Sequence, residues 1–177
     1  MQTAKNLYIS LSMNTEAAHL ISKLGLMPLP REGGFFAPSW TSSLRGSDGR
    51  PAGSAILFLV TENDFSALHR LRTDEMWHFH AGDPAELALL DPVTAVGSTR
   101  LLGPDVAGAH LASAVAPSGV WQGARILPPA GASPRGWTLF GCTLSPGWDE
   151  REFELGRRDE LCLQFPSHTR LIHALTR

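Results

Sequence analysis

The sequence predicts an all-β protein, a sandwich or closed barrel of antiparallel strands with short helices near both ends. Between residues 33 and 144, nine short apolar or alternating segments are separated by turns rich in Gly, Pro, Asp and Ser. Helical patterns occur only outside this region. A length of 177 residues, 43% of them hydrophobic, is enough for a single domain with a buried core and excludes a disordered chain.

The first helix is predicted over residues 14–25. Asn14 can cap its N-terminus, and Gly25 can end it in a left-handed conformation. The apolar residues between them form one stripe, which consists of Ala17, Leu20, Ile21 and Leu24. The preceding residues 1–12 are expected to be a loosely attached extension or an additional edge strand.

The nine strands of the predicted barrel occupy most of residues 33–144. They are expected at residues 34–41, 54–61, 66–72, 75–81, 85–90, 98–102, 110–116, 120–126 and 137–144. The two longer polar connections, 42–53 and 128–135, are predicted to be surface loops, and either could close over the mouth of a barrel.

Residues 157–177 are predicted to form a C-terminal helical segment. A helix over residues 157–164 ends before Pro166, because the residue preceding a proline disfavours helical backbone. A last helix is expected to begin at a Ser167 cap, with an apolar face of Leu171, Ile172 and Leu175.

The charges and cysteines exclude several classes of protein. The 15 Lys and Arg and 17 Asp and Glu give a net charge of −2 and are interspersed, so no surface for nucleic acid or an anionic membrane is predicted. The longest apolar run, residues 55–60, is far shorter than the roughly 20 residues that a membrane-spanning helix needs. Cys142 and Cys162 are too few for a disulfide framework, and no secretory signal is recognisable. We therefore expect a cytoplasmic protein with both cysteines reduced and Cys142 in the core.

A histidine and a glutamate are the strongest candidates for a functional site. If residues 72–74 form a hairpin turn, the alternation of side chains places Glu75 near His69, both pointing into the barrel. A buried carboxylate costs several kcal/mol unless it is paired, so a functional pair is favoured. The alternative is a hydrogen bond that only satisfies two buried polar groups.

Aromatic and polar residues near this pair are candidates for ligand contacts or for ordinary core packing. The alternation puts Trp77 and Phe79 on the inner face with Glu75, and His78 and His80 on the outer face. Aromatic side chains could stack on a planar or sugar ligand, although in a barrel they are more often core residues. Glu32, which precedes Gly33 and Gly34, is expected to be a turn residue, with a place on a pocket rim as the alternative.

These residues resemble the cupin superfamily. Its first motif, His-x-His-x3-Glu-x6-Gly, is matched in spacing by His69, Leu71, Glu75 and Gly82. In metal-binding cupins, the two histidines and the glutamate of this motif ligate one divalent ion inside a jelly-roll barrel. The resemblance therefore implies a cupin-type jelly roll in which His69 and Glu75 occupy ligand positions and Leu71 replaces a ligand.

The second cupin motif, Pro-x-Gly-x2-His, is similar to Pro117, Gly119 and Gln122, so an amide replaces its histidine. Four longer stretches resemble Cupin-5, a family of small single-domain cupins with no established reaction: residues 30–36, 74–84, 117–122 and 141–148. The resemblance spans the chain from about residue 15 to the C-terminus. It implies a homodimer with an internal pocket.

Three functions remain open at this point. In the first, the barrel binds a small molecule, sugar-like or nucleotide-sugar-like, and an isomerase or epimerase reaction uses His69 as a base oriented by Glu75. The barrel resembles that of deoxysugar epimerases, which pair an internal histidine with a tyrosine, whereas the one tyrosine here, Tyr8, lies outside the barrel region. In the second, a metal-dependent oxygenase or isomerase holds a divalent ion with His69, Glu75 and Gln122. The third is a non-catalytic ligand-binding or sensing module.

The predicted site therefore has two groups of residues. The catalytic candidates are His69 and Glu75, and the ligand-binding candidates are Trp77, Phe79, Trp121, Gln122 and His78. No cofactor is expected, because the two imidazoles that best suit transition metals are replaced by leucine and glutamine.

Overall fold

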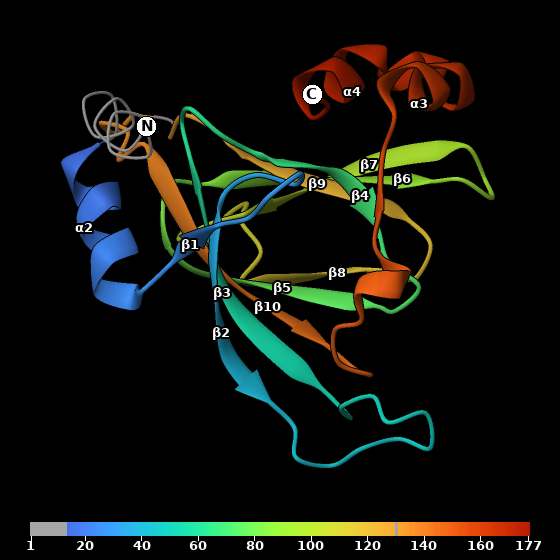
Figure 1. Ribbon diagram of the computed structural model, residues 1–177. Helices are drawn as coiled ribbons and strands as arrows, with labels where there is room; N and C mark the ends of the chain where they lie inside the picture. Colours follow the sequence, from blue (N-terminus) through green and yellow to red (C-terminus); the bar gives the residue numbers. More distant parts are fainter. Residues whose placement is uncertain (1–13, 130) are drawn as a thin grey trace, which may run out of the picture.

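The computed structural model describes residues 14–129 and 131–177, so the expected extension or edge strand at residues 1–12 lies outside the described part. Two sheets face each other, with α2 (Thr15–Leu24) beside one and the C-terminal helices above the other (Figure 1). The predicted all-β fold with short terminal helices is confirmed. No helix in these two ranges is long and apolar enough to cross a membrane.

Both sheets are antiparallel. Within the described residues, the first sheet has the order β1 (Met27–Pro28), β2 (Phe35–Thr41), β3 (Ser54–Thr61), β10 (Trp137–Leu144), β5 (Glu75–Gly82) and β8 (Ser113–Ala116). The second has the order β11 (Glu154–Leu155), β4 (Ser66–Arg70), β9 (Trp121–Ile126), β6 (Ala85–Asp91) and β7 (Val96–Leu102).

The main core fills the space between the two sheets. Trp77 is only 1% exposed and makes edge-on contacts with Phe58 and Phe140, at centroid distances of 5.8 and 5.3 Å. Inward-facing residues of the second sheet complete this layer, among them Leu87, Leu89, Leu102 and Ala124.

Helices cover the outer faces of both sheets. Asn14 caps α2 as predicted, because its side chain accepts hydrogen bonds from the backbone of Glu16 and Ala17, and Gly25 ends the helix in the left-handed region. On the second sheet, α3 (Arg158–Gln164) and α4 (Thr169–Ala174) bury a separate apolar cluster that includes Leu161, Phe165, Ile172 and Leu175.

The predicted cap at Ser167 is wrong. A 3-10 turn, η2 (Pro166–His168), leads directly into α4, whose N-cap is His168 without a side-chain hydrogen bond. Pro166 favours this turn because its fixed backbone angle suits the first position of a helical turn.

The predicted hairpin between His69 and Glu75 is also wrong. β4 and β5 belong to different sheets, so residues 71–74 cross from one side of the sandwich to the other. Because the crossing keeps both side chains on inner faces, His69 and Glu75 meet across the interior rather than along one hairpin.

Candidate ligand-binding site

A cavity of about 400 Å³ lies between the two sheets at one end of the sandwich. Most of its wall is apolar and aromatic, and includes Leu29, Phe36, Ile56, Leu71 and Phe153. Exposure shows its depth: Phe58 and Trp77 are 1% exposed, whereas Trp40 and Trp148 are 54% and 47% exposed. The cavity therefore opens to the surface near the two tryptophans and closes toward the core.

Three ionisable side chains meet at the buried end of this cavity. His69 lies between two carboxylates, with Nδ1 3.9 Å from Glu32 Oε1 and Nε2 3.9 Å from Glu75 Oε2. All three residues are less than 9% exposed, and all three line the cavity. A charged cluster is thus placed at the bottom of an otherwise apolar chamber.

The orientation of His69 is fixed from two sides. Its Nδ1 lies 2.8 Å from the carbonyl oxygen of Ala67, and because a carbonyl can only accept, Nδ1 is the donor. Its ring stacks on Phe153, with centroids 5.4 Å apart and an interplanar angle of 21°. Nε2 is therefore the nitrogen directed toward Glu75.

The two carboxylates keep the imidazole protonated. Burial lowers the pKa of His69, but the charges of Glu32 and Glu75 and the hydrogen bond to the Ala67 carbonyl together outweigh it and raise the pKa to about 9. His69 is consequently an imidazolium at neutral pH, with a proton on each ring nitrogen.

Glu32 reaches the cluster through a tight turn between β1 and β2. Gly33 and Gly34 have φ angles of 102° and 70°, and a side chain on Gly34 would collide with Phe58 and with the Leu59 carbonyl. The turn can therefore fold inward, where Ser66 Oγ donates to Glu32 Oε1 over 2.7 Å. Burial raises the pKa of Glu32 even though His69 and Ser66 favour its ionised form.

Glu75 is held by a chain of hydrogen bonds from behind the cavity wall. Gln122 Nε2 donates to Glu75 Oε2, and Trp77 Nε1 donates to Gln122 Oε1, both over 2.7 Å. Gln122 is 1% exposed and pairs with His69 across β4 and β9. The amide therefore fixes the carboxylate from outside the cavity.

The donor set does not fit the divalent ion that cupins often bind. Leu71 offers no donor atom, and both polar ends of the Gln122 amide are already engaged by Trp77 and Glu75. The Nδ1 atom of His69 is committed to the Ala67 carbonyl, so the imidazole could offer a metal only Nε2. Among the described residues, no group of three or more His, Cys, Asp or Glu could hold a metal.

The other predicted site residues lie in different places. Trp77 lines the cavity, whereas Phe79 packs against the core beside it. Trp121 points to the outer face of β9, where it packs under the C-terminal helices, because neighbouring side chains of a strand face opposite sides. His78 lies outside the barrel, with Nε2 3.2 Å from Thr143 Oγ1.

Cys142, expected in the core, lines the cavity, and burial raises the pKa of its thiol well above the ordinary value.

The sequence does not predict the buried position of Glu32 or the three aromatic side chains that line the open end of the cavity. Glu32 belongs to a turn, as expected, but its side chain is buried in the cluster; its position before two glycines is the signal that could have shown this. Trp40 and Phe153 lie outside the stretches that resemble cupins, and Trp148 is the last residue of one of them. All three lie in loops or near a strand end, where no periodicity reveals which way a side chain points.

Comparisons with known proteins agree on the fold and the family. The Cupin-5 family model, described as Cupin superfamily (DUF985), matches residues 18–156. A solved structure from Shewanella oneidensis is 31% identical, with a TM-score of 0.81, over 93% of this chain and 98% of that one. A hypothetical protein from Leishmania major is also 31% identical, with a TM-score of 0.81, over 90% of this chain and 98% of that one.

More distant structures share the fold alone. A cupin-2 domain from Rhodospirillum rubrum has a TM-score of 0.53 at 14% identity, over 78% of each chain. Oxalate decarboxylase from Bacillus subtilis has a TM-score of 0.53 at 13% identity, over 85% of this chain and 37% of that one. No curated protein matches the chain.

Proposed function

The chain belongs to the Cupin superfamily (DUF985), and we propose that its barrel binds a small organic molecule whose polar end meets His69 and Glu75. The observation that carries this proposal is the charged Glu32–His69–Glu75 cluster at the closed end of an apolar cavity that opens to the surface. A core that served stability alone would be filled with apolar side chains, because buried charges rarely add net stability. The cluster therefore supports a binding role.

The chemistry of the cavity favours an uncharged ligand. The imidazolium is already flanked by two acidic side chains, so a further anion would meet their repulsion and a cation would meet the charge of His69. A carbonyl oxygen can accept a hydrogen bond from Nε2, and a hydroxyl can in addition donate to Glu75. The aromatic wall suits the carbon face of a ring, as in a sugar or a related cyclic compound.

The same groups support an isomerase or epimerase activity by acid–base catalysis. In this proposal, the Glu75 carboxylate removes a proton from the carbon next to a carbonyl while His69 gives its Nε2 proton to the carbonyl oxygen. The products of this half-reaction are an enol, a protonated Glu75 and a neutral imidazole. Glu75 then returns its proton to the other face of the carbon while the enol hydroxyl gives its proton back to Nε2, which gives the epimer and regenerates both residues without a cofactor. If the carbon also carries a hydroxyl group, Glu75 instead protonates the former carbonyl carbon and that hydroxyl gives its proton to Nε2, which gives the isomer. In the first half-reaction His69 acts as the acid rather than the base expected from the sequence, because its pKa is about 9.

Binding is tested by thermal shift with a panel of sugars and other cyclic hydroxy-carbonyl compounds. A ligand that binds the folded state raises the melting temperature. We expect Glu75→Gln and His69→Gln to abolish the shift and the exposed Glu62→Gln to retain it. A shift that survives both cavity substitutions would contradict the proposed site, and the absence of any shift across the panel would contradict the ligand class.

Catalysis is tested separately by incubating each bound compound with the protein in deuterium oxide. Proton transfer at carbon incorporates deuterium, which NMR or mass spectrometry detects. Incorporation that depends on Glu75 would support the isomerase reaction, whereas binding without incorporation would identify a non-catalytic binding module.

A further inference from the structure

Residues 145–153, between β10 and β11, form a strap that connects the two sheets at the open end of the cavity. The strap contains the 3-10 turn η1 (Glu150–Glu152) and follows the right-hand side of the molecule in Figure 1. Three of its side chains line the cavity: Trp148, Glu150 and Phe153. Whatever fixes the strap therefore also fixes one wall of the pocket.

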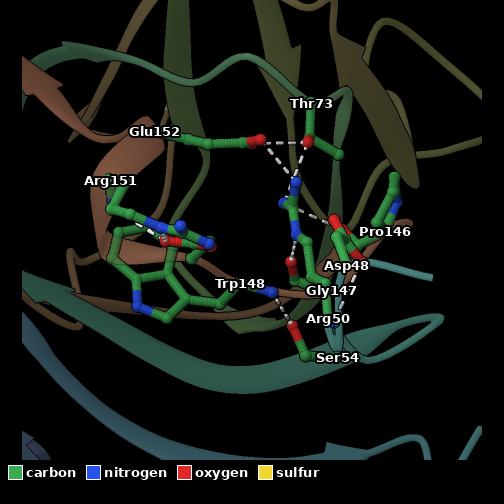
Figure 2. A network of polar contacts seen from close by, with 10 residues as sticks. Asp48, Arg50, Ser54, Thr73, Pro146, Gly147, Trp148, Arg151 and Glu152 are labelled. Atoms are coloured by element: carbon green, nitrogen blue, oxygen red, sulfur yellow. Dashed lines mark hydrogen bonds and ion pairs between the residues drawn. The ribbon is translucent and has the colours of Figure 1, made fainter. Parts of the chain in front are cut away.

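One buried arginine joins the strap to two other segments. Arg50 lies in the loop between β2 and β3, and its guanidinium contacts the Glu152 carboxylate, the Gly147 carbonyl and, at 3.0 Å, Thr73 Oγ1 (Figure 2). Thr73, on the crossing between β4 and β5, in turn donates to Glu152 Oε2 over 2.7 Å. The Arg50 side chain is only 9% exposed. Loss of one partner in such a buried network leaves the other charged group without compensation.

Backbone contacts reinforce the same junction. The amide of Trp148 donates to Ser54 Oγ over 2.8 Å (Figure 2). The amide of Gly147 donates to the Pro51 carbonyl, also over 2.8 Å. The strap is thus docked along the loop that carries Arg50, and this loop leads into β3 at the cavity wall.

The network leads directly to the charged cluster. Glu152, which Arg50 holds, precedes Phe153, and the Phe153 ring stacks on His69 at 5.4 Å. A strap that moved outward would take Phe153 away from the imidazole and open the cavity beside it.

We propose that Arg50 is a positioning residue that holds the strap closed over the barrel pocket, so that access to the pocket and the surroundings of His69 both depend on the contacts among Arg50, Thr73 and Glu152. This inference rests on the proposed function only in treating the cavity as the ligand site. Its test uses no ligand, so failure of one proposal is distinguishable from failure of the other.

Cys142 provides the test, because its thiol lines the cavity and is only 3% exposed. In a Cys162→Ala background, the probe is N-ethylmaleimide, and the measured quantity is the rate at which it modifies Cys142. We expect Arg50→Gln to accelerate modification by about tenfold or more, because opening of the strap becomes more frequent. Loss of a positive charge can only disfavour the thiolate and slow the reaction, so acceleration cannot arise from that effect.

Arg151→Gln is the matched control. Arg151 lies on the same strap, and its side chain is 82% exposed, but its ion-pair partner Asp149 lies on the strap as well. This substitution should leave the modification rate within about twofold of the parent, because surface ion pairs contribute little. Equal rates in Arg50→Gln and the parent would overturn the proposal.

Two further measurements separate positioning from a general loss of stability. Glu152→Gln keeps Arg50 but removes the carboxylate charge that Arg50 binds. This substitution should also accelerate modification of Cys142, and a rate equal to that of the parent would count against the proposal. The NMR titration of the His69 imidazole should shift in Arg50→Gln and stay unchanged in Arg151→Gln. An unchanged His69 titration in Arg50→Gln would refute the connection through Phe153.

Discussion

His69 carries a charge inside the barrel, and this charge links stability to pH. The folded protein raises the pKa of His69 from 6.5 to about 9, so the folded state binds this proton more tightly than the unfolded chain does. The resulting stabilisation is fully present below pH 6.5 and is lost as the pH rises toward 9. Glu32 acts in the same direction from lower pH, because its raised pKa makes ionisation in the folded state unfavourable.

The free energy of unfolding should therefore fall between pH 6.5 and pH 9, on the order of 3 kcal/mol for a shift of this size. Urea denaturation at a series of pH values measures it. In His69→Gln the curve should be flatter over this window, since the titrating group is gone. A wild-type curve that rises over the same window would show that the two carboxylates do not hold the proton on His69.

Gln122 contributes to stability because it forms buried hydrogen bonds with both Trp77 and Glu75. Gln122→Leu keeps the size of the side chain but leaves Trp77 Nε1 and Glu75 Oε2 without their partner, so we expect a loss of about 1–3 kcal/mol in stability. Chemical denaturation checks this expectation. Gln164→Leu is the control, because the amide of Gln164 is exposed and donates to the Pro92 carbonyl at the surface. Equal effects of the two substitutions would show that the buried amide is not needed.

The sequence predicts the position of some side chains of the site but not of others. His69 and Glu75 could be found because a six-residue spacing and strand alternation bring them to inner faces, even though the assumed hairpin is a crossing between sheets. Phe153 could not, because a short strap with no repeating pattern carries it to the imidazole. The sequence identifies the amide of Gln122 as a replacement for a metal ligand, but its role in holding Glu75 depends on distances that only the folded chain defines.

The sequence predicts strands best where an apolar run is bounded by clear turn residues. β3 (Ser54–Thr61) and β10 (Trp137–Leu144) have the predicted ends, because strongly apolar strands there are bounded by clear turn residues. The two-residue strands β1 and β11 were missed, since two residues carry no period. β8 begins at Ser113 rather than at residue 110, because His110 belongs to the preceding loop, where its Nδ1 accepts from the Asp105 amide.

The C-terminal helices should be an integral part of the fold rather than an appendage. Phe165, at the end of α3, is 1% exposed in the cluster between these helices and the second sheet. Phe165→Ala should cost about 3–5 kcal/mol in unfolding free energy, whereas Leu163→Ala on the same helix, at 85% exposure, should cost little. Thermal and urea denaturation compare the two. A small effect at Phe165 would mean that the helices separate from the sheet independently.

The whole protein is expected to fold and remain stable without a metal ion. Elemental analysis after thorough dialysis should find no stoichiometric transition metal, and EDTA should leave the melting temperature unchanged, because leucine and an engaged amide occupy two cupin ligand positions. His69→Ala should then alter ligand binding rather than metal content. About one metal ion per subunit would contradict this expectation and favour the metal-dependent alternative.

The homodimer implied by the family resemblance stays a prediction. Both sheets end in edge strands, β1 and β8 in the first and β11 and β7 in the second, as far as the described residues show. Pairing of such an edge with a second copy would cover its free backbone groups. Sedimentation at micromolar concentration measures the mass in solution, and a monomer there would contradict the expectation.

The crossing between β4 and β5 has a mechanical consequence. Because His69 belongs to one sheet and Glu75 to the other, the 3.9 Å between their nearest atoms is set by the thickness of the core and not by the register of neighbouring strands. Hydrostatic pressure acts most where packing is incomplete, and the cavity leaves the two layers incompletely packed at this junction. The NMR chemical shift of the His69 imidazole should therefore change with pressure and report the spacing between the two sheets. This change should occur at pressures below those at which the strands separate.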